Sequence, residues 1–97
     1  MVKYLALFQF TEQGIKNISD SVGRANAFQK LAQKAGASVK ALYWTAGAYD
    51  GAVVLEAPDE TTAVALFAKL GSLGNVRTQC LRAFDQSEME SILAKAR

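Results

Sequence analysis

Two apolar runs joined by a glycine-containing turn constrain the fold of this chain more than any other feature. The runs are Val39–Trp44 and Ala52–Leu55, and Gly47, Asp50 and Gly51 stand between them. Glycine and aspartate are favoured where a backbone reverses direction, so the segment predicts an antiparallel β-hairpin. A turn does not require the aromatic side chains that crowd this one, and they make it the first candidate for a site.

The elements predicted on either side of the hairpin alternate between strand and helix. Pro58 ends the strand after the turn, because proline has no N–H for a ladder hydrogen bond, and Gly36 is suited to ending the helix before it. The predicted strands are residues 3–10, 37–45, 51–57 and 75–84, and the predicted helices start near residues 11, 21, 59 and 85. The order βαββαβ, with an extra C-terminal helix, predicts a single α+β domain over residues 1–97. Its ferredoxin-like fold has one four-stranded antiparallel sheet with helices on one face.

Apolar residues three or four positions apart predict a buried face on each of the longer helices. These faces are Val22, Ala25, Phe28, Ala32 and Ala35, then Ala63, Leu66, Phe67 and Leu70, and finally Met89, Ile92, Leu93 and Ala96. The last helix also has an N-terminal capping signal, in which Glu88 follows Asp85 at the spacing of a capping box. Cys80 lies in the middle of the predicted fourth strand and is expected to be a small buried apolar residue.

The first predicted strand, residues 3–10, has bulky apolar side chains in both of its alternating sets. Such a strand is covered on both faces, whereas the helices of this fold cover only one. The chain is also 51% hydrophobic and only 21% charged, which is a high apolar share for a small monomer. We therefore expect a second copy of the chain to cover the open sheet face, in a homodimer or a higher homo-oligomer.

Composition argues against several classes of function. The net charge is +2 and the basic residues do not cluster, so no nucleic-acid-binding surface is expected. No apolar run approaches the roughly 20 residues that span a bilayer, and the N-terminal segment lacks the organisation of a signal peptide, so no membrane association is expected. The chain has no histidine, the usual general base and zinc or haem ligand, and we expect neither a metal nor another cofactor. The single cysteine cannot form an internal disulfide, which fits a cytoplasmic location.

Several segments in one order along the chain resemble the GYD domain family, a branch of the dimeric α+β barrel superfamily. They are residues 11–16, 43–51, 56–61, 71–78 and 81–84. The Gly-Tyr-Asp signature is spaced here as Gly47-Ala48-Tyr49-Asp50. The resemblance implies a ferredoxin-like subunit that assembles through its sheet face as a dimeric α+β barrel. It implies no activity, since relatives at superfamily distance range from cofactor-free monooxygenases and small isomerases to haem enzymes and stress-response proteins.

Aromatic and acidic residues at the turn are the leading candidates for ligand binding. Tyr49 beside Asp50 could exchange protons with a bound ligand. Alternatively, Asp50 binds backbone amides of the turn and Tyr49 packs on a neighbour. Tyr43 and Trp44 point to opposite faces of one strand, so that one joins the core or an interface and the other is available to line a pocket.

Outside the turn, the ligand-binding candidates are Thr11, Gln13 and Arg77. Thr11 and Gln13 lie at a helix start, where a hydroxyl, an amide and backbone N–H groups hold an anion or simply cap the helix. Arg77 and Arg82 face opposite sides of the fourth strand. One of them is available to bind a carboxylate ligand, and the alternative is that both form ordinary salt bridges.

These observations leave three functions open. The first is a homo-oligomeric protein that binds a small molecule in a pocket by the sheet and the turn at residues 47–50. The second is a cofactor-independent enzyme, similar to a monooxygenase or an isomerase, that acts on a small aromatic or carbonyl compound. The third is a purely structural oligomer, in which the signature residues serve only the turn and the interface.

Overall fold

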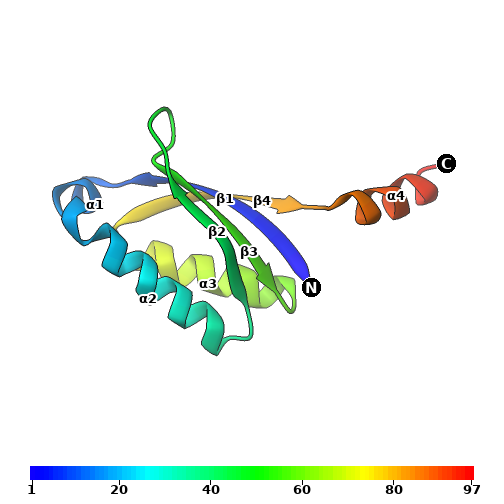
Figure 1. The fold of residues 1–97 in the computed structure, drawn as a ribbon, viewed down its shortest axis with the longest axis horizontal. Helices are drawn as coiled ribbons and strands as arrows, with labels where there is room; N and C mark the ends of the chain where they lie inside the picture. The colour runs from blue at the N-terminus through cyan, green and yellow to red at the C-terminus, as the bar shows by residue number, and fades with distance from the viewer.

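The predicted hairpin is present and forms one half of a four-stranded antiparallel sheet with the order β2-β3-β1-β4. In this computed structural model, which describes residues 1–97, the strands are β1 (Val2–Phe10), β2 (Ser38–Trp44), β3 (Gly51–Ala57) and β4 (Val76–Ala83). The helices are α1 (Glu12–Lys16), the 3₁₀ turn η1 (Ile18–Asp20), α2 (Ser21–Lys34), α3 (Glu60–Ser72) and α4 (Gln86–Lys95). The ferredoxin-like α+β fold expected from the sequence is therefore confirmed (Figure 1).

Helices α2 and α3 lie next to each other under one face of the sheet, and the core forms between the two layers (Figure 1). Alternation along β3 directs Val53, Leu55 and Ala57 into this core, where Leu55 is fully buried. The rings of Phe28 in α2 and Phe67 in α3 stack with their centroids 6.1 Å apart. Burying one side chain such as Leu55 stabilises the fold by about 1.5–3 kcal/mol.

The expected buried face of α3 is confirmed except at Leu70, which is partly buried, whereas that of α2 is correct for fewer of its residues. Ala63, Leu66 and Phe67 are buried in α3. In α2 only Phe28 and Ala32 are buried, and Val22 is 59% exposed. The sheet meets α2 along a stripe that is rotated away from Val22, because the orientation of a helix depends on the surface against which it packs.

Helix α4 extends away from the sheet beyond the end of β4 (Figure 1), and the expectation of a buried apolar face on it is wrong for this chain. Met89, Ile92 and Leu93 are 44%, 38% and 53% exposed. The apolar stripe exists as the sequence predicts, but no other part of the chain lies within reach to cover it.

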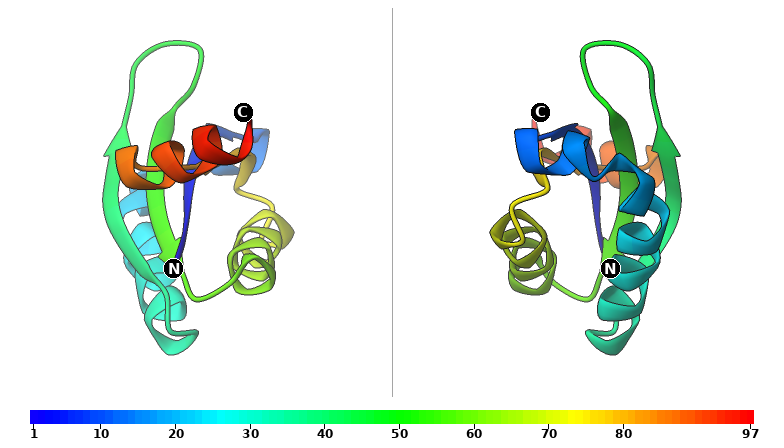
Figure 2. Two further views of the ribbon diagram at one scale, coloured as in Figure 1. Left: turned by 90° about the vertical axis from the view of Figure 1, so that its right-hand side faces the viewer. Right: turned by 90° about the vertical axis from the view of Figure 1, so that its left-hand side faces the viewer.

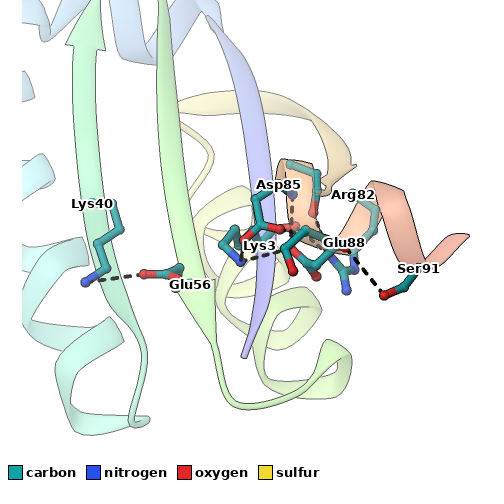
Figure 3. Close-up of polar contacts among 9 residues, drawn as sticks. Lys3, Lys40, Glu56, Arg82, Asp85, Glu88 and Ser91 are labelled. Carbon is teal, nitrogen blue, oxygen red and sulfur yellow. Dashed lines mark hydrogen bonds and ion pairs between the residues drawn. The ribbon is translucent and has the colours of Figure 1, made fainter.

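The start of α4 is nonetheless held by a charged cluster (Figure 3). The predicted capping box is present, and Lys3 on β1 contacts Asp85 at 3.3 Å and Glu88 at 3.0 Å. Backbone N–H groups of the box hold the pKa values of Asp85 and Glu88 below their ordinary values, and Lys3 adds to this effect. The hydrogen bond to Glu88 raises the pKa of Lys3, so all of these groups are held in their charged forms.

Cys80 is exposed rather than buried, because it lies on the edge strand β4. Pro58 follows the last residue of β3 as predicted, and Gly36 follows α2 with a φ of +79° that suits glycine. No helix of the chain combines the length and the apolar character that crossing a bilayer requires.

Candidate functional site

A cavity of about 250 Å³ opens between α2, the end of α3 and the helix-covered face of the sheet. Its walls come from every strand of the sheet and from both long helices. The lining includes Phe10, Ser21, Arg24, Phe28, Trp44 and Asn75. Since the cavity lies beside the last residue of β2, the hairpin and the cavity are parts of one region.

The lining of this cavity is overwhelmingly apolar, with 12 hydrophobic residues among 15. Phe10, Phe28 and Trp44 supply aromatic surface, and Leu31 and Leu42 supply aliphatic surface. A mostly apolar lining with a few polar groups is the usual character of a small-molecule site. The lining contains no carboxylate, cysteine or tyrosine.

Arg24 is the one charged residue of the lining, and backbone carbonyls position it. Its Nη1 donates to the carbonyl oxygen of Asn17 at 2.9 Å, and its Nη2 donates to that of Gly14 at 3.4 Å. No carboxylate of the chain lies within salt-bridge distance of Arg24. The guanidinium is therefore anchored by carbonyl oxygens and forms no salt bridge within the chain.

Asp50 ties the signature turn to the end of β1. Its Oδ2 accepts a hydrogen bond from the backbone N–H of Phe10 at 2.7 Å, and its own N–H donates to the carbonyl oxygen of Phe8 at 2.8 Å. These contacts fit the interpretation in which Asp50 binds backbone amides. Its carboxylate fastens the turn to the last residue of β1, and Asp50 does not line the cavity.

Tyr49 and Trp44 point in different directions from the same turn. The Tyr49 hydroxyl donates to Oε1 of Gln79 on β4 at 2.5 Å, while the carbonyl oxygen of Ala48 accepts from Gln9 on β1 at 2.9 Å. These bonds fasten the turn, which reaches past the end of the sheet (Figure 2), to the two neighbouring strands. Trp44 lines the cavity, whereas Tyr43 faces the open side of the sheet and is 64% exposed, as expected from their alternation.

Thr11 and Gln13 join α1 to the loop that precedes β4. The Thr11 side chain caps α1 by accepting from the N–H of Gly14, and its hydroxyl donates to the carbonyl oxygen of Gly74. Gln13 Nε2 donates to the carbonyl oxygen of Leu73 and to Oδ1 of Asn75. Both side chains therefore hold the rim of the cavity, where Leu73 and Asn75 are part of the lining.

Arg77 lies on the opposite face of the sheet from the cavity. It pairs in register with Gln9, is exposed, and has no carboxylate partner in the chain. Arg82, its counterpart on the helix-covered face, lies 3.8 Å from Glu60 and stacks on the ring of Phe84. The structure thus separates Arg77 from Trp44, and the two cannot contact one ligand within a single chain.

Several cavity residues were not among the sequence candidates, above all Arg24 and Phe28. A signal for them is present in the sequence, since Ser21, Arg24, Ala25 and Phe28 follow one another at helical spacing. Arg24 shares this side of the helix with Ala25 and Phe28, and this position indicates that its side chain faces the interior. No group of three or more His, Cys, Asp or Glu side chains is placed to hold a metal ion.

The fold and the cavity together define a ferredoxin-like domain with an apolar pocket under its sheet. A model of the GYD domain family matches residues 4–93, and the chain belongs to this family, whose function is unknown. No match was found among curated proteins. The search of solved structures gave no match either.

Proposed function

We propose that this protein binds a small, mostly apolar molecule in the cavity between α2 and the sheet. The observation that carries the proposal is the cavity itself, whose lining is apolar apart from Ser21, Arg24 and Asn75. An engineered cavity of about 150 Å³ holds benzene, so 250 Å³ accommodates one aromatic ring with a short substituent. The cavity is too small for a dinucleotide or a haem.

A catalytic role at the turn has less support than binding. Tyr49 donates its hydroxyl proton to Gln79, and the Asp50 carboxylate accepts from the Phe10 N–H. Neither residue lines the cavity, so no proton donor or acceptor of the turn faces a ligand held there. The cofactor-independent enzyme therefore ranks below a binding protein. The purely structural oligomer is the outcome if the cavity binds nothing.

Trp44 provides a direct assay, since it is the sole tryptophan of the chain and lines the cavity. Phenylacetamide, a neutral single-ring probe, is expected to change Trp44 fluorescence saturably with a Kd on the order of 1 mM. Ala25→Leu fills part of the cavity and should abolish this response. Ala68→Leu, at an exposed position on α3, is the matched control and should preserve it. An unchanged response in Ala25→Leu would place the probe elsewhere.

We also propose that the protein is a homo-oligomer assembled through the open face of the sheet, as a dimeric α+β barrel. The middle of this face is apolar, and no helix packs on it. Its apolar residues are Leu5, Leu7, Ala41, Tyr43, Ala52, Val54 and Leu81. Helix α4 supports the same conclusion, because a 10-residue helix is marginal in water without a packing surface.

We place the protein in the cytoplasm because its only cysteine cannot form a disulfide within the chain.

Light scattering coupled to size exclusion tests this assembly. The native protein should have at least twice the 10.4 kDa mass of one chain. Leu81→Glu places a charge in the middle of the open face and should shift the mass toward 10.4 kDa. Val64→Glu, at an exposed position on α3, should leave the mass unchanged. A native protein that elutes as a single chain would contradict the proposal.

A further inference from the structure

We infer that the cavity selects a ligand with one carboxylate, attached to a single ring or a chain of similar size. This inference rests on the proposed binding function and adds the chemical class of the ligand. It starts from the one charge in the lining, Arg24, for which the chain supplies no carboxylate partner. A positive group at the edge of an apolar cavity favours an anionic ligand over a neutral ligand of equal size.

The geometry around Arg24 fits this role because its side chain is fixed before a ligand arrives. The carbonyl oxygens of Asn17 and Gly14 accept from Nη1 and Nη2 and hold the guanidinium plane. The remaining N–H groups of the guanidinium have no partner in the chain. A planar guanidinium with free N–H groups matches the two oxygens of a carboxylate. Arg24 is also half-buried, which strengthens its interaction with an anion.

Other donors lie at the same end of the cavity. Ser21 is one helical turn from Arg24, and its hydroxyl makes no hydrogen bond in the chain. Asn75 Oδ1 accepts from Gln13, which leaves the amide Nδ2 of Asn75 free to donate. Gly14 brings this end together, since its carbonyl oxygen binds Arg24 while its Cα packs against the Asn75 backbone. The cavity therefore has a donor-rich end, while its remaining walls are apolar.

The size of the cavity limits the rest of the ligand. A volume of about 250 Å³ exceeds the roughly 150 Å³ that holds benzene by enough for a short acidic substituent. Long-chain fatty acids and fused multi-ring acids are too large to be enclosed. Phenylacetate is therefore a suitable probe, and phenylacetamide is its neutral counterpart of the same shape.

Titrating both probes against Trp44 fluorescence tests the inference. The native protein should bind phenylacetate about tenfold or more tightly than phenylacetamide, because the hydrogen bonds to Arg24 are charge-assisted. Arg24→Gln should remove the preference, so that phenylacetate binds no better than phenylacetamide. Lys30→Gln removes an exposed positive charge from the same helix and should leave the preference intact.

Each outcome supports or overturns a distinct statement. If phenylacetate binds no tighter than phenylacetamide to the native protein, the carboxylate class is wrong and the binding function stands. If neither probe binds, the proposed function fails and this inference fails with it. If the preference survives in Arg24→Gln, Arg24 is not the partner of the carboxylate. Because Arg24 also connects α1 to α2, circular dichroism is used to check that the Arg24→Gln variant keeps the native fold. Arg24→Lys, which keeps the charge without the planar fork, should retain a reduced preference.

Discussion

Replacing Asp50 with alanine is expected to lower the free energy of unfolding by about 2 kcal/mol and to leave the affinity for phenylacetamide unchanged. The carboxylate accepts the backbone N–H of Phe10 at 2.7 Å, and alanine leaves this half-buried donor without a partner. For a domain of this size the loss corresponds to a fall in Tm of about 8–16 °C. Thermal unfolding and probe titration of the same preparation measure both quantities.

Two further variants define what the Asp50 result means. Asp50→Asn keeps an acceptor oxygen and should restore much of the lost stability. Asp20→Ala removes a carboxylate that makes no cap hydrogen bond, and it should change stability by no more than about 0.5 kcal/mol. If Asp50→Ala instead keeps the native Tm and loses the probe, the signature aspartate is a ligand-binding group and our account of the turn is wrong.

Replacing Gly14 with alanine is expected to destabilise the protein by about 1–3 kcal/mol, although alanine is the best helix former. A Cβ at this position would overlap the backbone carbonyl of Asn75, which cannot rotate away. The same loop is fastened to α1 by Thr11 and Gln13, so relief requires α1 and the cavity rim to separate. Chemical denaturation should show a lower free energy of unfolding for Gly14→Ala than for the native protein. The affinity of the variant for phenylacetamide should also be lower.

Gly23→Ala is the matched control, with the opposite expected sign. Gly23 also lies in a helix, but a Cβ there meets nothing within 4 Å. Alanine should therefore stabilise α2 by about 0.5–1 kcal/mol. Equal effects of the two substitutions would mean that helix propensity, not the contact with Asn75, governs position 14.

The parts of the fold that the sequence predicts are those determined by local chemistry. The turn at Gly51, the strand end at Pro58 and the capping box of Asp85 and Glu88 each depend on neighbouring residues, and each is present. The alternation of Tyr43 and Trp44 is equally local, because successive strand residues face opposite sides. These elements in order are sufficient to predict the ferredoxin-like topology.

The candidate site was harder to predict because it depends on contacts between distant segments. Trp44 is a candidate from the sequence. Arg24 and Phe28 line the same cavity because of the orientation in which α2 packs on the sheet, and the sequence does not specify that orientation. Asp50 was a candidate because of its chemistry, and its partner Phe10 lies in another strand. Helix α4 has the amphipathic pattern of a packed helix, yet the chain has no surface that receives it. A pattern predicts that a face is apolar, but it does not identify what covers that face.

The most direct test of the binding function is an NMR titration of ¹⁵N-labelled protein with phenylacetamide. Our account predicts that the largest shifts fall on the Trp44 indole and on the amides of α2 from Ser21 to Leu31. Amides away from the cavity, such as those of Leu5 and Leu81 in the middle of the sheet, should move little. Shifts confined to the open face, or no saturable shifts at all, would contradict the claim that the cavity under the sheet is the binding site.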